Sequence, residues 1–332
     1  MIDPKKRKAP GNRPIMHDSF QMQTTEQHTG MEEHRTIAVE LNRMPQENID
    51  MPLMNRPDME ANNEQLIEAR NEPNLSANRA VERETFQEFS PLRRVRKSNN
   101  NKLTAMLQVR NEQGRYLEEV LQDLSEFVDE IVIVDDASTD GTADVCRAFA
   151  KVVRLDVLEK PLFAEEWRLR NTLWQAAVST CPDWLLAVDA DELYSTEAKQ
   201  AIRKLIDQDY ADWFAFRFYD MWGGRTHYRE DELWSLHKRH TTSLVRYMPG
   251  YPYFYPQQNH HVPRLPVSCT VLSGVCTELK VQHLGWAGSL EDRVRKYLRY
   301  KRIDPHGEWG NPAQYESILD PEPRLLPWKE GP

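Results

Sequence analysis

Two apolar segments of this chain each end in a pair of aspartates, and this feature constrains the fold more than any other. Residues 130–136 read EIVIVDD, and residues 183–193 read DWLLAVDADEL. A continuous apolar or β-branched run of this length is typical of a strand buried on both faces of a parallel sheet. Carboxylates at the end of a buried strand need hydrogen-bond donors or a cation beside them.

The segments around these two strands alternate between strand and helix patterns. Residues 102–109 and 152–159 read as further strands. Residues 114–128 carry apolar side chains at the spacing of an amphipathic helix, and residues 165–180 form a second expected helix. This alternation predicts an α/β fold with a Rossmann-like, doubly wound and mostly parallel sheet. Right-handed crossovers place the carboxyl ends of its strands at one edge, where ligands bind.

The first hundred residues differ in composition from the rest of the chain. All 9 Trp and all 12 Tyr lie beyond residue 100, and the first hundred residues have Phe20, Phe86 and Phe89 as their aromatic residues. Such a segment buries too little apolar surface to offset the entropy of ordering, ~1–2 kcal/mol per residue for the backbone. We therefore expect 1–100 to be a mostly disordered extension, rich in Asn, Gln, Glu and Met, that docks a protein partner.

Charge and hydropathy exclude two classes of protein. The formal net charge of -9 argues against a broad cationic surface for nucleic acid. No apolar run approaches the ~18–20 residues of a transmembrane segment. The basic N-terminus lacks the apolar stretch of a secretory signal, so we expect a cytoplasmic protein. The four cysteines lack metal-binding spacing and are expected to be reduced, with a Cys269–Cys276 disulfide as the alternative.

The acidic ends of the two strands are expected to share one crevice. Asp135 and Asp136 end one strand, and Asp189 and Asp191 end the other. Each ionised carboxylate opposes ionisation of the next, so a cation is expected among them. Oxygen ligands select a hard divalent ion, Mg²⁺ or Mn²⁺, held by one or two carboxylates and by substrate phosphates. The alternative for a single acid is to cap the next helix, and Glu192 is expected to do so.

Four segments carry a family resemblance. In chain order they are TAMLQVRNE, EIVIVDDASTDGTADV, RNTLWQAA and LLAVDADEL. Together they resemble the family 2 glycosyltransferases, whose fold is of the GT-A type, strongly to residue 193 and weakly to residue 305. The resemblance implies a domain over 101–305, with a nucleotide-sugar-binding half (101–193) and an acceptor half (194–305), followed by a C-terminal tail (306–332).

The resemblance also implies roles for individual residues. Asp136 would bind the nucleobase of a sugar nucleotide, and Asp189 would face the ribose or the water shell of a metal ion. Asp191 would bind the metal that bridges the diphosphate, and His283 would complete the metal site. The other implied contacts to the donor come from Gln108, Arg110, Glu112, Asp135 and Arg170.

The implied reaction moves a sugar from a UDP-, GDP- or dTDP-sugar to a saccharide or other hydroxyl acceptor, with inversion. Synthesis of a surface polysaccharide or glycan is the implied setting. A divalent ion, Mn²⁺ or Mg²⁺, would stabilise the charge that grows on the leaving diphosphate.

Inversion also needs a carboxylate that deprotonates the acceptor hydroxyl. We expect Asp231 to be this base, because Tyr228 and Trp234 flank it and burial would raise its pKa. The other candidates are Asp220, Glu230 and Glu232.

Two other functions fit parts of the sequence. A nucleotidyltransferase also sets carboxylates over a nucleotide and a metal, but QVRNEQGRYLEE lacks the expected glycine-rich, basic loop after the first strand. A catalytically weak GT-A-like scaffold would instead use the N-terminal extension to dock partners. The intact Asp136, Asp189 and Asp191 argue against that loss of catalysis. Metal-dependent binding of a nucleotide sugar would separate the scaffold from the transferase.

Overall fold

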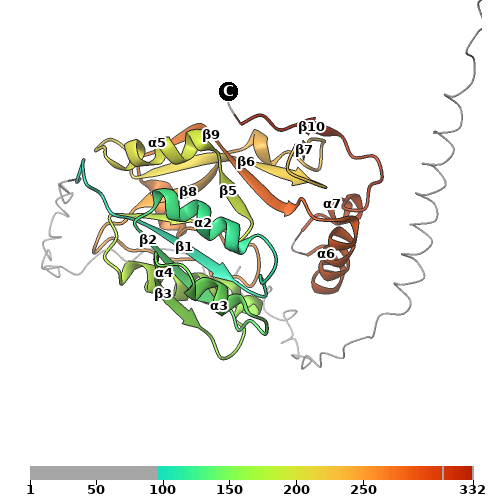
Figure 1. Cartoon of the computed structure of the whole chain (residues 1–332), viewed down its shortest axis with the longest axis horizontal. Coiled ribbons are helices and arrows are strands. Elements are labelled where there is room, and N and C mark those ends of the chain that lie inside the picture. The colour runs from blue at the N-terminus through green and yellow to red at the C-terminus, as the bar shows by residue number, and fades with distance from the viewer. Residues whose placement is uncertain (1–95, 309, 331–332) are drawn as a thin grey trace, which may run out of the picture. The chain divides into compact units, whose positions relative to one another are not determined.

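The computed structural model describes residues 96–308 and 310–330 (Figure 1). They belong to one unit of the chain, Phe86–Pro332. The extension expected over 1–100 lies outside the described residues, apart from 96–100. Its expected disorder and its partner docking therefore stay predictions.

Four neighbouring parallel strands form one end of the sheet. β1 (Leu103–Val109), β2 (Glu130–Asp135), β3 (Val152–Val157) and β4 (Trp184–Ala187) lie in the order β3-β2-β1-β4. β1 pairs with β2 on one side and with β4 on the other. Its side chains enter apolar clusters on both faces of the sheet, which explains why the strand sequence is apolar throughout.

Further strands extend this sheet beyond β4. β8 (Thr241–Arg246) pairs antiparallel with β4, and β6 (Trp213–Trp222) pairs antiparallel with β8. β6 also pairs with β7 (His227–Arg229) and, in parallel, with β9 (Gly274–Trp286), while β10 (Leu325–Pro327) pairs with β7. The expected α/β fold is therefore confirmed, with neighbouring parallel strands at one end of the sheet and antiparallel pairs beyond β4.

Helices cover both faces of the sheet, as a doubly wound arrangement requires. α2 (Leu117–Phe127) and α5 (Thr196–Ile206) bury their apolar residues in one cluster, and α3 (Thr142–Arg147) adds to it. α4 (Glu166–Val178) packs in the second cluster. In α2 the buried residues recur three or four positions apart, so one face of the helix meets the sheet: they are Leu117, Val120, Leu121, Leu124 and Phe127.

The C-terminal part adds α6 (Leu290–Ile303) and α7 (Pro312–Ser317), drawn in red in Figure 1. A third cluster of apolar residues joins these helices to β6 and β9, and Trp222, Trp286 and Ile318 are buried in it. The segment after residue 305, expected as a tail, thus contributes α7 and β10. Short 3-10 turns lie in the connections at Phe163–Glu165, Leu236–Lys238 and Val267–Val271.

The segment 183–193, expected as one strand, forms two. β4 ends at Ala187, and β5 (Glu192–Tyr194) pairs with β9 instead of β1. Asp189 and Asp191 therefore lie in the turn between two strands. The expected capping role of Glu192 is wrong, because Ser195 caps α5 by accepting a hydrogen bond from the Ala198 N–H.

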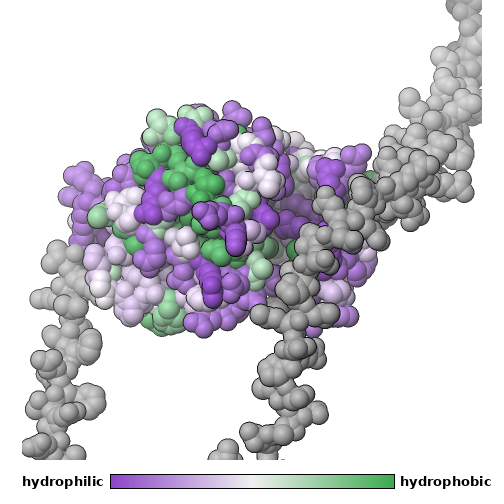
Figure 2. All heavy atoms as spheres, turned by 90° about the horizontal axis from the view of Figure 1, so that it is seen from below, coloured by the Kyte–Doolittle hydropathy of each residue, from purple (hydrophilic) through white to green (hydrophobic). Residues whose placement is uncertain are grey.

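The cysteines form no disulfide among themselves. All four cysteines are free, so the Cys269–Cys276 disulfide does not form, and Cys146 and Cys269 are buried. Within the described ranges, no helix has the length and apolar character to span a bilayer. On the face shown in Figure 2, hydrophilic residues surround smaller apolar patches.

Ile133 tests the packing of the central sheet. It is fully buried in β2, so Ile133→Ala should lower the free energy of unfolding by ~2–5 kcal/mol through the cavity it leaves. Val153→Ala is the control, because that side chain on the edge strand β3 is 51% exposed. The control should change stability by about 0.5 kcal/mol or less. Urea unfolding followed by circular dichroism measures both, and equal effects would contradict this packing.

Candidate functional site

The turn after β4 meets strand β9 at Asp191 and His283. Pairing of β5 with β9 sets Glu192 opposite His283. His283 Nε2 lies 3.7 Å from Asp191 Oδ1, and His283 Nδ1 lies 2.7 Å from Oδ1 of Asp220 on β6. A carboxylate on one ring nitrogen fixes the direction of the other, which is the usual support of a metal-binding histidine. The predicted pair of Asp191 and His283 is thus brought together, with Asp220 behind it.

A glycine keeps side-chain atoms away from this pair. A Cβ atom at Gly285 would lie 2.7 Å from His283 Nε2 and 3.2 Å from Asp191 Oδ2. Carbon atoms do not approach a nitrogen that closely without displacing it. Any larger residue at position 285 would therefore move the imidazole away from its present direction.

The charge of His283 follows from its two acidic neighbours. Burial opposes protonation, but Asp191 and Asp220 outweigh it and raise the pKa of His283 to about 9. Without a metal ion the ring is therefore mostly protonated at neutral pH. A metal ion on Nε2 would have to displace that proton.

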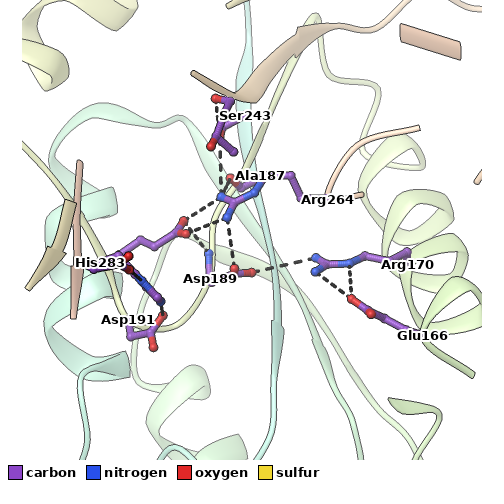
Figure 3. A network of polar contacts seen from close by, with 11 residues as sticks. Glu166, Arg170, Ala187, Asp189, Asp191, Ser243, Arg264 and His283 are labelled. Carbon is purple, nitrogen blue, oxygen red and sulfur yellow. Dashed lines mark hydrogen bonds and ion pairs between the residues drawn. The ribbon is translucent and has the colours of Figure 1, made fainter. Parts of the chain in front are cut away.

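Asp189 lies between two arginines (Figure 3). Arg264 Nη2 is 3.3 Å from Asp189 Oδ2, and Arg170 Nη1 is 3.9 Å from Asp189 Oδ1. Each arginine is held by a buried glutamate, Arg264 by Glu192 and Arg170 by Glu166. Burial opposes ionisation of Asp189, but the neighbouring cations, led by Arg264, lower its pKa. The carboxylate therefore stays ionised in this partly buried position.

Asp136, at the end of β2, is buried and well supplied with donors. Its carboxylate accepts hydrogen bonds from the backbone N–H groups of Leu162 and Phe163. Arg110 Nη1 lies 3.5 Å from Asp136 Oδ2. Arg110 and Asp136, each predicted separately to contact the donor, therefore lie together at the carboxyl edge of the sheet.

Asp135 and Gln108 present buried acceptors at the same edge. Asp135 Oδ1 accepts the Ser138 N–H, whereas Asp135 Oδ2 has no hydrogen-bond partner within the described part of the chain. The same holds, within those residues, for Gln108 Oε1. A buried acceptor without a donor costs ~1–3 kcal/mol, so a ligand carrying N–H or O–H groups would be favoured here.

Glu112 and Lys296 add charges of both signs near Asp191. Burial raises the pKa of Glu112; Arg115 opposes the shift and Asp191 adds to it. Burial lowers the pKa of Lys296 on α6, and Asp191 opposes that shift. Lys296 Nζ donates to the carbonyl oxygen of Gly285. Helix α6 thus supplies a cation close to the acids of the turn.

Asp231, the expected base, is held by local contacts after β7. Its Oδ2 accepts a hydrogen bond from Arg229 Nε at 2.6 Å, and its Oδ1 accepts the N–H groups of Leu233 and Trp234. The other candidate, Asp220, binds His283. A proton transferred to either carboxylate would compete with these partners.

The glutamates behind the two arginines were not identified from sequence. Glu166 and Arg170 have the i,i+4 spacing of a helical ion pair, which was a readable signal. Glu192 and Arg264 are 72 positions apart, and no local pattern indicates their pairing. Glu192 Oε2 also accepts the N–H of Asp189 at 3.0 Å.

The raised pKa of His283 predicts how stability changes with pH when its acidic neighbour Asp220 is replaced. Its folded pKa, about 9, lies above the unfolded value of about 6.5. Its contribution to stability is therefore complete below about pH 6.5 and is lost as pH rises through about 9. In Asp220→Asn the pKa of His283 should fall, so this variant should lose more stability at pH 6 than at pH 9.5.

Urea unfolding in the presence of a chelator measures this difference. Nuclear magnetic resonance titration of the histidine ring signals gives the pKa directly. A His283 pKa near 6.5 in the metal-free wild type would contradict the described contacts.

Comparison with known proteins gives one family match. A family model described as "Glycosyl transferase family 2" matches residues 104–271. An uncharacterized protein of Mycobacterium tuberculosis is 26% identical over 227 residues, 66% of this chain and 54% of that protein. The SPbeta prophage-derived glycosyltransferase SunS of Bacillus subtilis is 30% identical over 114 residues, 33% of this chain and 24% of SunS. The chain spans about half the length, or less, of these curated relatives.

Solved structures give more distant likenesses. TarS of S. aureus has a TM-score of 0.42 and 17% identity, covering 66% of this chain and 42% of TarS. The mannosyltransferase PcManGT of Pyrobaculum calidifontis, in complex with GDP-Man and Mn²⁺, has a TM-score of 0.40 and 15% identity, covering 66% of this chain and 68% of that chain.

Proposed function

The chain belongs to glycosyl transferase family 2, and on this premise we propose that it transfers a sugar from a nucleoside-diphosphate sugar to an acceptor hydroxyl, with inversion. The observation that carries the proposal is the meeting of Asp191, His283 and Asp220 from three separate segments. Synthesis of a surface polysaccharide or glycan is the proposed setting. The alternative of a partner-docking scaffold rests on residues 1–100, most of which lie outside the described part.

The nucleoside would lie at the carboxyl ends of β1 and β2. Asp136 is the proposed partner of the nucleobase, with Arg110 beside it. The buried acceptors Asp135 Oδ2 and Gln108 Oε1 support a ligand with donor groups at this edge. Asp189, the partly exposed acid of the next strand end, is proposed to face the ribose or water on a metal ion.

Asp191 and His283 are the proposed ligands of a divalent cation. They fit such an ion, because His283 Nε2 faces Asp191 and Gly285 keeps a side chain out of the space beside them. Over the ranges described, no three His, Cys, Asp or Glu side chains form a metal-binding group. A cation would therefore take its other ligands from diphosphate oxygens and water. The imidazole ligand favours Mn²⁺ over Mg²⁺, which prefers oxygen alone.

A bound cation would act as a Lewis acid on the leaving diphosphate. The chain itself supplies positive charge from Lys296 on α6, whose pKa responds to Asp191. A fixed cation beside the departing oxygens stabilises the charge that develops there. The charges of Arg115 and Asp191 both act on Glu112, and Glu112 and Arg115 are proposed to border the diphosphate.

The acceptor hydroxyl must lose its proton as the new bond forms. Asp231 is the proposed base, and Asp220 is the second candidate. Asp220 has a further role in holding the imidazole of His283. General-base catalysis of this kind contributes ~10²–10⁴-fold in rate.

Nucleotide binding tests the proposal directly. UDP-, GDP- and dTDP-sugars should be tested for thermal stabilisation of the full chain, with and without Mn²⁺. At least one should raise the melting temperature only with Mn²⁺, because a ligand at 100 times its Kd adds ~2.7 kcal/mol of stability. Asp191→Ala should abolish the dependence on Mn²⁺. Asp144→Ala, at an exposed aspartate on α3, is the matched control and should keep it.

No shift with any of the three sugar nucleotides would refute the transferase. A shift that depends equally on Mn²⁺ in wild type and in Asp191→Ala would refute the metal assignment alone. These two outcomes separate the function from the site.

Asp231→Asn tests the base. If Asp231 accepts the proton, kcat should fall ~100-fold or more while the affinity for the sugar nucleotide is unchanged. Asp144→Asn, the same change at an exposed aspartate on α3, is the control and should keep full activity. A loss of stability in Asp231→Asn with unchanged kcat would show that its bond to Arg229 is structural.

A further inference from the structure

We infer that Arg264 is a positioning residue for the donor site. Held by Glu192, it fixes the carboxylate of Asp189 and thereby sets the affinity for the nucleoside diphosphate. The link to donor affinity rests on the proposed function. All the contacts that support the inference lie among residues that the structure describes.

Glu192 holds Arg264 in one orientation. Arg264 Nη1 lies 2.9 Å from Glu192 Oε2, and Nη2 lies 2.8 Å from Oε1. Two parallel bonds of this kind fix the plane of the guanidinium as well as its place. The guanidinium also stacks over the ring of Phe218, 4.9 Å from its centroid, and its Nη1 lies 3.5 Å from the carbonyl oxygen of Ala187.

The same pair holds Asp189 at two points. Glu192 Oε2 accepts the backbone N–H of Asp189, and Arg264 Nη2 approaches the side-chain Oδ2. One ion pair therefore positions both the backbone and the side chain of Asp189. Rotation of the carboxylate would break its contact with Arg264.

The exposed fraction of each side chain shows which of the three residues can contact a ligand. The side chain of Asp189 is 36% exposed, that of Arg264 is 16% exposed, and that of Glu192 is 1% exposed. Glu192 has almost no surface through which to touch a nucleotide. Its effect on binding must therefore pass through Arg264 and Asp189.

The loop that carries Arg264 also contacts Glu166, the glutamate that holds the second arginine beside Asp189. Glu166 Oε2 accepts the N–H of Val262, and the N–H of Glu166 donates to the carbonyl oxygen of Asn259. Glu166 binds Arg170, the cation on the other side of Asp189. Residues 259–264 thus connect both cations around this acid.

This loop also reaches the nucleobase end of the proposed donor site. The ring of His260 lies 6.3 Å from the ring of Phe163, centroid to centroid. The backbone N–H of Phe163 donates to Asp136. Loss of the contact between Arg264 and Glu192 should therefore loosen residues 259–264 beside Phe163 as well as the carboxylate of Asp189.

Lysine is the informative replacement for Arg264. It keeps the positive charge but lacks the planar fork that binds a carboxylate through two bonds. Glu192→Gln is the second informative variant, because it keeps the shape of the side chain and removes its charge. If the lysine variant fails to fold, the glutamine variant tests the same inference.

The experiment uses the full chain and titration calorimetry with UDP, GDP and dTDP in the presence of Mn²⁺. Loss of a residue that orients a ligand-binding group typically costs ~10–100-fold in affinity, so Arg264→Lys and Glu192→Gln should each raise Kd at least ~10-fold. Because Arg264 and Glu192 act as one unit, the Kd of the double variant should be no higher than the higher Kd of the two single variants. In turnover assays the donor KM should rise while kcat changes little.

Arg246→Lys is the matched control. Arg246 is 4% exposed, lies 3.5 Å from Asp212 and stacks over the ring of Trp184. It ends β8 opposite the start of β4, whereas Asp189 follows the end of β4. The control should lower the melting temperature while the Kd stays within about twofold of wild type, since exchanges away from a site rarely couple to it.

Three outcomes would overturn the inference. If wild type binds a nucleoside diphosphate and both Arg264→Lys and Glu192→Gln bind it equally well, the inference fails and the proposed function stands. If Arg246→Lys weakens binding as much as Arg264→Lys does, general loosening of the fold explains the effect. If wild type binds none of the three nucleotides, the proposed function and the inference fail together.

Discussion

The parallel pairing of β1 with both β2 and β4 is the constraint on which the site depends. This register brings the carboxyl ends of the three strands to one edge of the sheet. Asp136 follows β2 and Asp189 follows β4, so both acids reach that edge without any further folding of the chain. A shift of one residue in either pairing would turn these side chains to the opposite face.

Compensation of charge is the second requirement. Glu166, Arg170, Asp189, Arg264 and Glu192 form a line of alternating charges in a partly buried region. Breaking a buried ion pair by removing one partner typically costs ~3–5 kcal/mol, so the members depend on one another. The chain thereby holds an ionised carboxylate at the sheet edge before any ligand arrives.

Local patterns predicted the parallel core well and the polar partners poorly. The apolar runs at β1, β2 and β4 and the spacing of α2 were readable, because burial imposes a period on each element. The break between β4 and β5 was missed, because the apolar pattern does not reveal that β5 pairs with β9. Glu192 was assigned a capping role for the same reason: its partner Arg264 lies on a distant loop.

The amino-acid sequence by itself determined the strands, their alternation with helices and the acids at the strand ends, since these follow from local burial and from the handedness of crossovers. Tertiary structure decided which groups meet those acids. His283 reaches Asp191 through the pairing of β9 with β5, and Arg264 reaches Asp189 through a loop. Such contacts join distant positions through pairing and packing, and no periodicity along the chain encodes them.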